Sequence, residues 1–127
     1  MAIQIRLAPI NTGLYVGGES TSANKEFFQK RARGGVDICM VGNIAVSERN
    51  VPNDSTGVMS SSEKWSELAS AIRLSGSKPG IQLSATLPGY RGQTAFICER
   101  HDKELCYYQT LFNKMTQKDW EYLVMCF

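Results

Sequence analysis

The feature that most limits the possible folds of this chain is an alternation of short apolar segments with amphipathic ones. Three apolar stretches have the length and composition of strands: residues 3–10, 36–42 and 78–85. Helical periodicity is found in three further segments: residues 24–35, 60–76 and 116–127. A βαβαβα order of this kind favours a parallel sheet with helices packed outside it.

The helical segments are supported by apolar residues spaced three and four apart. One side of the first helix combines apolar residues with an arginine stem: Phe27, Phe28, Arg31 and Ala32. The apolar positions of the second helix are Trp65, Leu68, Ala69 and Ile72. Those of the third are Trp120, Leu123, Val124 and Phe127. Ser60 and Glu63 have the spacing of a capping box, and Thr116 is the expected cap of the third helix.

Two architectures have this order of elements: an open doubly wound sheet, and the first part of a (β/α)8 barrel. A complete barrel needs about 250 residues, so this chain would supply about three of its β/α units. The sequence stops on the apolar side of its last helical segment, without a glycine or polar tail. We therefore expect residues 1–127 to be the truncated N-terminal half of a larger domain.

Charge and composition argue against several classes of partner. The net charge is +2, too small to favour nucleic acid or an anionic membrane surface. No apolar run approaches the roughly 20 residues of a membrane span, and the first residues do not resemble a secretion signal. The four cysteines form no C-x-x-C pair. Together these features favour the reducing cytoplasm.

Two local patterns look like ligand sites but lack the spacing that such sites need. Cys98, His101 and Cys106 are close in sequence, but a structural zinc site usually has four protein ligands and no fourth is evident. An ordinary polar loop is the favoured interpretation, with His101 a solvated residue rather than an acid–base catalyst. The glycine-rich residues 13–18 do not follow the G-x-G-x-x-G pattern and do not lead directly into a helix.

Three amides mark the expected ligand edge of the sheet. In parallel α/β folds, ligands gather at the carboxyl ends of the strands, and those ends here carry Asn11, Asn43 and Gln82. Each amide both donates and accepts hydrogen bonds, so together they suit a planar, neutral heterocycle such as an isoalloxazine or a pyrimidine. The alternative is that they only cap turns and strand ends, which is a frequent role of such side chains.

Four stretches resemble one known family in order and spacing: "LAPINTGLY" at 7–15, "FFQKRARGGVDICMVGNIAVS" at 27–47, "SEKWSELASAIRLSGSKPGIQL" at 62–83 and "MTQKDWEYLVMCF" at 115–127. Together they are similar to the N-terminal half of an old yellow enzyme, of the NADH:flavin oxidoreductase family. The first stretch resembles most the branch that includes 2,4-dienoyl-CoA reductases. "RARGGV" after a helix, combined with "GIQL" in the third strand, is more specific than either alone.

The resemblance implies an FMN-dependent (β/α)8 barrel that takes hydride from NAD(P)H and reduces activated C=C bonds of a small-molecule substrate. It places Pro9 and Ile10 beside the flavin and Asn11 near the flavin ring. It matches Gln82 to the glutamine that bonds the pyrimidine edge of the flavin. Asn43 falls where the family usually has alanine or glycine beside the ring, so the larger amide is a departure.

Other departures concern the catalytic residues. After the third strand this chain has "SATLPGYRGQ", where family members often carry "HAGR". The substrate-binding histidines, the proton-donating tyrosine and the phosphate-binding loops would lie beyond residue 127. No catalytic residue is therefore assigned, and we expect this fragment alone to be inactive. The alternative function is a non-catalytic half-barrel that associates with itself or another chain through open sheet edges.

Overall fold

The computed structural model describes residues 3–60, 62–85 and 113–126. Three parallel strands form its main sheet: β1 (Arg6–Ile10), β4 (Ile38–Ala45) and β6 (Lys78–Ser84). β4 lies between the other two and pairs with both. The short β5 (Gly57–Val58) pairs in parallel with the last residues of β4, beyond the point where β1 ends. The parallel sheet expected from the alternating sequence pattern is confirmed.

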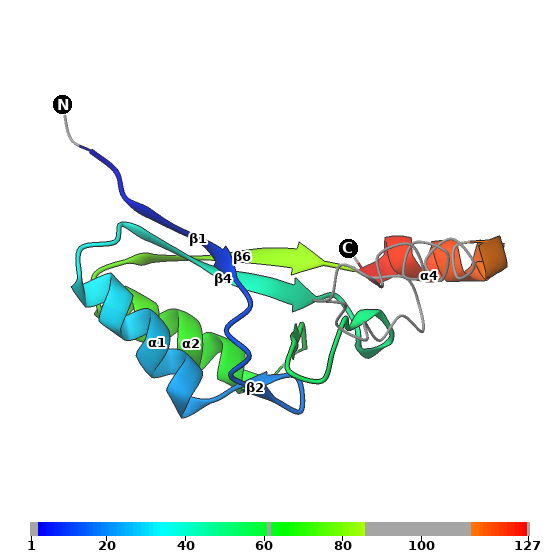
Figure 1. The fold of residues 1–127 in the computed structure, drawn as a ribbon, viewed down its shortest axis with the longest axis horizontal. Coiled ribbons are helices and arrows are strands. Elements are labelled where there is room, and N and C mark those ends of the chain that lie inside the picture. The colour runs from blue at the N-terminus through cyan, green and yellow to red at the C-terminus, as the bar shows by residue number, and fades with distance from the viewer. Residues whose placement is uncertain (1–2, 61, 86–112, 127) are drawn as a thin grey trace, which may run out of the picture.

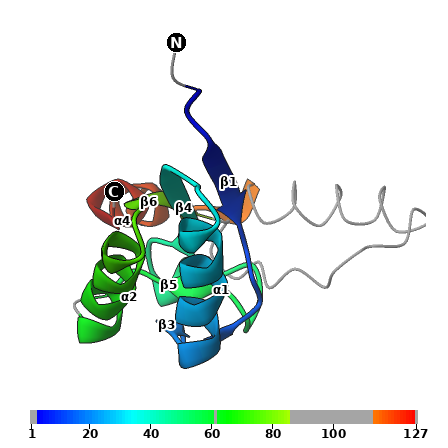
Figure 2. The same ribbon diagram turned by 90° about the vertical axis from the view of Figure 1, so that its left-hand side faces the viewer.

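Two helices cover one face of this sheet, namely α1 (Ser22–Arg33) and α2 (Glu63–Leu74). They lie side by side beneath the strands (Figure 1), and the view along the strands places both on the same side (Figure 2). No helix of the described residues covers the opposite face. An arc of a barrel and one half of a doubly wound sheet share this arrangement, and the described strands fit either.

The hydrophobic core lies between the two helices and the sheet. Its fully buried members include Phe28 from α1, Cys39 and Ile44 from β4, and Leu68 and Ile72 from α2. These are the helix faces that the apolar spacing predicts. Full burial of each large side chain stabilises the fold by about 1.5–3 kcal/mol, so the amphipathic pattern determines which side of each helix meets the sheet.

Local contacts complete the packing of α1. The Thr21 side chain caps the helix by accepting a hydrogen bond from the Asn24 backbone amide at 3.2 Å. The Arg31 guanidinium lies 3.3 Å from the centroid of the Phe27 ring, and its Nη1 donates to the Phe27 carbonyl at 2.8 Å. The predicted contribution of Arg31 to the apolar side of the helix is therefore confirmed. Cys39 is a buried free thiol, as its apolar surroundings in the sequence indicate.

Several expected element boundaries differ from the structure. The first strand begins at Arg6 and not at residue 3, and the first helix spans Ser22–Arg33 in place of 24–35. β4 does not end near Gly42 but continues to Ala45, so Asn43 lies inside the strand. α2 begins at Glu63 with Ser62 as its N-cap, in place of Ser60. The glycine-rich loop contains a hairpin that the sequence pattern did not predict, made by β2 (Tyr15–Val16) and β3 (Glu19–Ser20).

The C-terminal helix, α4 (Gln117–Cys126), starts close to its expected position. Thr116 Oγ1 accepts from the Asp119 amide at 3.4 Å, and Asp119 Oδ2 accepts from the Thr116 amide at 2.9 Å. The first of these bonds confirms Thr116 as a cap. The Asp119 carboxylate accepts from the Thr116 amide and, at 2.8 Å, from the Thr116 hydroxyl, and these two bonds hold the pKa of Asp119 below its usual value. No described residue of α4 is buried.

Two further expectations concern metals and membranes. Cys98, His101 and Cys106 lie outside the described residues, and within the described ranges no cluster of three His, Cys, Asp or Glu side chains is placed to hold a metal ion. None of the helices in the described part of the chain is long and apolar enough to cross a membrane.

Candidate functional site

Three neighbouring strands bring Pro9, Gly42 and Gln82 together near their carboxyl ends. A Cβ atom built on Gly42 would lie 2.9 Å from Gln82 Cβ and 3.0 Å from Pro9 Cβ. Val41 and Ile81 pair in the sheet and line the side that faces α2. Because side chains alternate along a strand, the positions that follow them, Gly42 and Gln82, face the uncovered side of the sheet.

Gln82 is an exposed amide on this uncovered face. Its Oε1 would lie 3.4 Å from a Cβ on Gly42, so the side chain folds over the glycine. The side chain forms no hydrogen bond with any other described residue. Its two N–H groups and its carbonyl are therefore accessible to a ligand that lies against the sheet.

The side chain of Asn11, by contrast, is hydrogen-bonded to other residues of the chain. Its Nδ2 donates to Thr56 Oγ1 at 3.2 Å, and its Oδ1 accepts from the Gly13 amide at 3.0 Å. Thr56 in turn donates to Asn53 Oδ1 at 3.0 Å. Asn11 thus braces the loop after β1 against the segment before β5, which is the turn-capping role considered as the alternative in the sequence analysis.

The remaining predicted residues occupy the same edge of the sheet in different environments. Asn43 is half-buried within β4, and its side chain has no hydrogen-bond partner among the described residues. Pro9 and Ile10 are exposed at the end of β1, with Ile10 46% accessible. The structure therefore brings Pro9 and Gln82 together around Gly42, whereas Asn11 turns to the loops.

A buried polar cluster near this edge was not predicted from the sequence. Asn24, fully buried in the first turn of α1, donates from Nδ2 to Thr12 Oγ1 at 2.7 Å. Its Oδ1 accepts from Ser20 Oγ at 3.2 Å. The cluster fixes the hairpin of β2 and β3 to the helix. The only signal of this cluster in the sequence is that Asn24 lies three residues after the Thr21 cap. The apolar periodicity of the helix does not indicate that a polar residue is buried there.

The Tyr15 hydroxyl lies beside this cluster and is buried without a well-formed hydrogen bond. Burial raises the pKa of the phenol, because the phenolate would lose its hydration. The nearby Asn24 and Thr12 side chains oppose this effect but do not overcome it. Tyr15 is therefore held in its neutral form inside the core.

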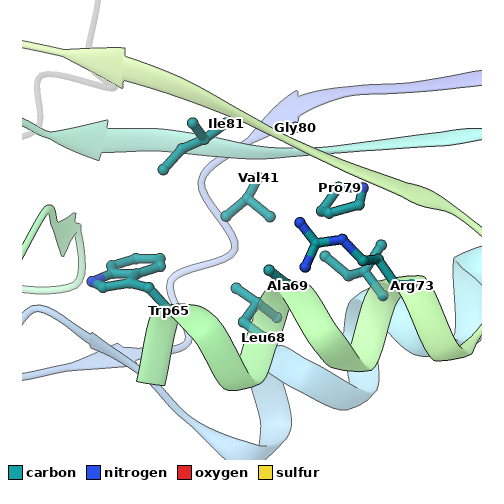
Figure 3. Close-up of a pocket in the computed structure, with 9 residues that line it drawn as sticks. Val41, Trp65, Leu68, Ala69, Arg73, Pro79, Gly80 and Ile81 are labelled. Atoms are coloured by element: carbon teal, nitrogen blue, oxygen red, sulfur yellow. The ribbon is translucent and has the colours of Figure 1, made fainter. Parts of the chain in front are cut away.

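A cavity of about 220 Å³ lies on the other side of the sheet, between α2 and β6. Its walls are mainly apolar and are formed by Val41, Trp65, Leu68, Ala69, Ile72, Arg73, Pro79, Gly80 and Ile81. Figure 3 shows Arg73 extending from α2 so that its guanidinium lies over this space. None of the five predicted site residues lines it. The predicted site and this cavity are thus on opposite faces of the sheet.

Comparison of the sequence with models of protein families and with curated proteins found no match.

Proposed function

We propose that this chain is the N-terminal arc of an FMN-binding (β/α)8 barrel of the old yellow enzyme type. Complete barrels of this type use NAD(P)H to reduce activated C=C bonds of small molecules. The proposal rests on the four matching stretches of sequence, and the parallel order β1, β4, β6 with helices on one face is compatible with it. The free thiols of Cys39 and Cys126 suit the reducing cytoplasm that we propose as its location.

The observation that carries the proposal is the amide of Gln82. It projects from the uncovered face, near the carboxyl edge where parallel sheets bind ligands, and has no side-chain partner among the described residues. A flavin pyrimidine edge alternates carbonyl and N–H groups, which a primary amide can pair with from both of its ends.

Each predicted residue fits this cofactor to a different degree. Gln82 would bond the pyrimidine edge, and Pro9 and Ile10 would present an apolar surface to the ring. Asn43 has no side-chain hydrogen-bond partner among the described residues, but its side chain takes space that a smaller residue would leave open. Asn11 does not fit a direct contact, because both ends of its amide already bond to Thr56 and Gly13.

Bound FMN would supply the hydride transfer, and the protein would supply binding and orientation. Within this chain no residue is assigned to donate a proton or to hold the substrate. We therefore propose that the chain alone binds flavin without reducing a substrate, and that turnover requires the rest of a barrel.

The test is the co-elution of FMN with the purified chain in gel filtration, followed by its visible absorbance. We expect perturbed flavin absorbance in the protein peak, and for Gln82→Ala an FMN dissociation constant raised about tenfold, because one buried polar contact is lost. Gln29→Ala is the matched control, since Gln29 lies on α1, on the helix-covered side. FMN that elutes entirely free from the unmodified chain would overturn the proposal, as would equal losses in both variants.

A further inference from the structure

We propose that two copies of this chain form a dimer in which each places its α4 in the groove between α2 and β6 of the other. This groove is the apolar cavity lined by Trp65, Arg73 and Ile81 and their neighbours. The inference does not depend on flavin binding, because the groove and Gln82 lie on opposite faces of the sheet.

The groove is an apolar surface that remains open in the single chain. It lies beside β6, which pairs only with β4 among the described strands and is therefore an edge strand. Ile81 at its border is 41% accessible and Leu83, further along the same strand, is 37% accessible. In a parallel α/β sheet such a surface is normally covered by a further helix. An amphipathic helix is thus the occupant that its shape and chemistry suit.

α4 is a helix of this kind. None of its described residues is buried, and Val124 on its apolar side is 76% accessible. It lies beyond the carboxyl end of β6 and clear of α1 and α2 (Figure 1). Arg49 holds it there, through an ion pair of 3.1 Å with Asp119 and by lying 4.4 Å from the Tyr122 ring centroid. None of the residues that line the groove of this chain belongs to α4.

Charge also matches between the two surfaces. The Arg73 guanidinium lies over the groove (Figure 3) and forms no ion pair with a carboxylate of the described residues. Glu121 borders the apolar side of α4 and accepts one hydrogen bond, from Gln117 Nε2 at 3.3 Å. A carboxylate retains acceptor capacity after one such bond. Glu121 is thus available to pair with Arg73 of a second copy.

A second copy is favoured over an unrelated helix because both copies carry the same α4 and the same groove. Two copies would therefore form two such contacts, whereas an unrelated helix would form one. Each copy would contribute one side of the 10-residue helix and the 9 residues that line its groove. One helix in one groove would give half of that contact, and specific interfaces usually involve about 20 residues a side. The two-fold arrangement therefore comes nearer to the size of a stable interface than a single helix in one groove.

The test is sedimentation velocity of the full chain over a range of concentrations. We expect a dimer whose dissociation constant rises at least tenfold in Val124→Glu and in Ala69→Glu, because each places a carboxylate in the apolar contact. The matched controls are Met125→Glu on the other side of α4 and Leu74→Glu on α2, which is 88% accessible and does not line the groove. Both should dimerise as the unmodified chain does, and circular dichroism should confirm that every variant is folded.

Charge reversal provides an independent test. Arg73→Glu and Glu121→Arg should each weaken the dimer, and the double variant should recover most of the loss. A chain that is monomeric at all concentrations would overturn the proposal. So would a dimer that either Val124→Glu or Ala69→Glu leaves intact, or larger species in place of a closed dimer. FMN binding is measured separately on the same variants, and its absence would affect only the proposed function.

Discussion

At the residue scale, Gly42 shows how one position constrains the edge of the sheet. The two atoms nearest to a Cβ there, Gln82 Cβ and Pro9 Cβ, are fixed to neighbouring backbones and cannot rotate away. We expect Gly42→Ala to lower the free energy of unfolding by about 1–3 kcal/mol, the usual cost of overpacking. Urea denaturation measures this loss. In a Gln82→Gly background the loss should shrink, and an unchanged loss there would show that another contact causes it.

Tyr15 supports a second prediction at this scale. Its hydroxyl is buried without a well-formed hydrogen bond, so Tyr15→Phe should leave stability at pH 7 unchanged or raise it. The pKa of Tyr15 is raised above 10.0 in the folded state, so the folded state holds the proton more tightly than the unfolded chain. The contribution of Tyr15 to the free energy of unfolding is present below the pKa that it has in the unfolded chain. This contribution is lost as the pH rises through the pKa that Tyr15 has in the folded state.

The measurement for Tyr15 is urea denaturation at pH 7 and at about pH 10.5, just above the ordinary tyrosine pKa. We expect the unmodified chain to lose more stability between these two pH values than the Tyr15→Phe variant. Tyr122→Phe, on the accessible helix α4, is the control and should keep the full pH dependence. Equal pH dependence in the Tyr15→Phe variant and the unmodified chain would contradict the prediction.

At the scale of elements, the capping of α2 distinguishes two serines that look alike in sequence. Ser62 Oγ accepts from the Lys64 amide at 3.2 Å, whereas Ser60 Oγ accepts only from the Ser62 amide, outside the helix. Ser62→Ala should therefore cost about 1 kcal/mol of stability, as the loss of an N-cap usually does. Ser60→Ala should cost less than half of that. Thermal unfolding of both variants measures the difference, and a reversed order would restore Ser60 as the cap.

The helices were predictable because burial repeats with the helical period, and Phe28, Leu68 and Ile72 occupy the positions that this period marks. The end of β4 was not predictable, because the polar residue Asn43 interrupts an apolar strand that then continues through Ile44. The missed hairpin had a usable signal in Gly17 and Gly18. Their φ values of 58° and 77° are those of a two-residue hairpin turn, for which a Gly-Gly pair is typical.

The candidate site was predictable only where it depends on the strands themselves. Gln82 follows the alternation of β6, so its place near the ligand edge could be predicted from the sequence. The role of Asn11 could not be predicted, because its hydrogen-bond partner Thr56 lies 45 residues further along the chain. Likewise, nothing local indicates that Asn24 is buried, since Thr12 and Ser20 reach it only when the hairpin folds onto α1.

At the scale of the whole molecule, the free energy of local opening should fall from the centre of the sheet to α4. β4 pairs with β1, β5 and β6, and its side chains Cys39 and Ile44 are fully buried, so its amides should exchange only through global unfolding. α4 has no buried side chain and should open locally at far lower free energy in the monomer. Native-state hydrogen exchange, measured at a concentration where the chain is monomeric, tests this order.

Repeating the exchange measurement at higher concentration separates two explanations of what covers α4. If a second copy binds α4, protection of its amides should rise with concentration, because occupied grooves follow mass action. Protection of β4 should rise only by the stability that the dimer adds. If α4 is already as protected as β4 in the monomer, it packs within its own chain, and the reciprocal exchange of helices is excluded.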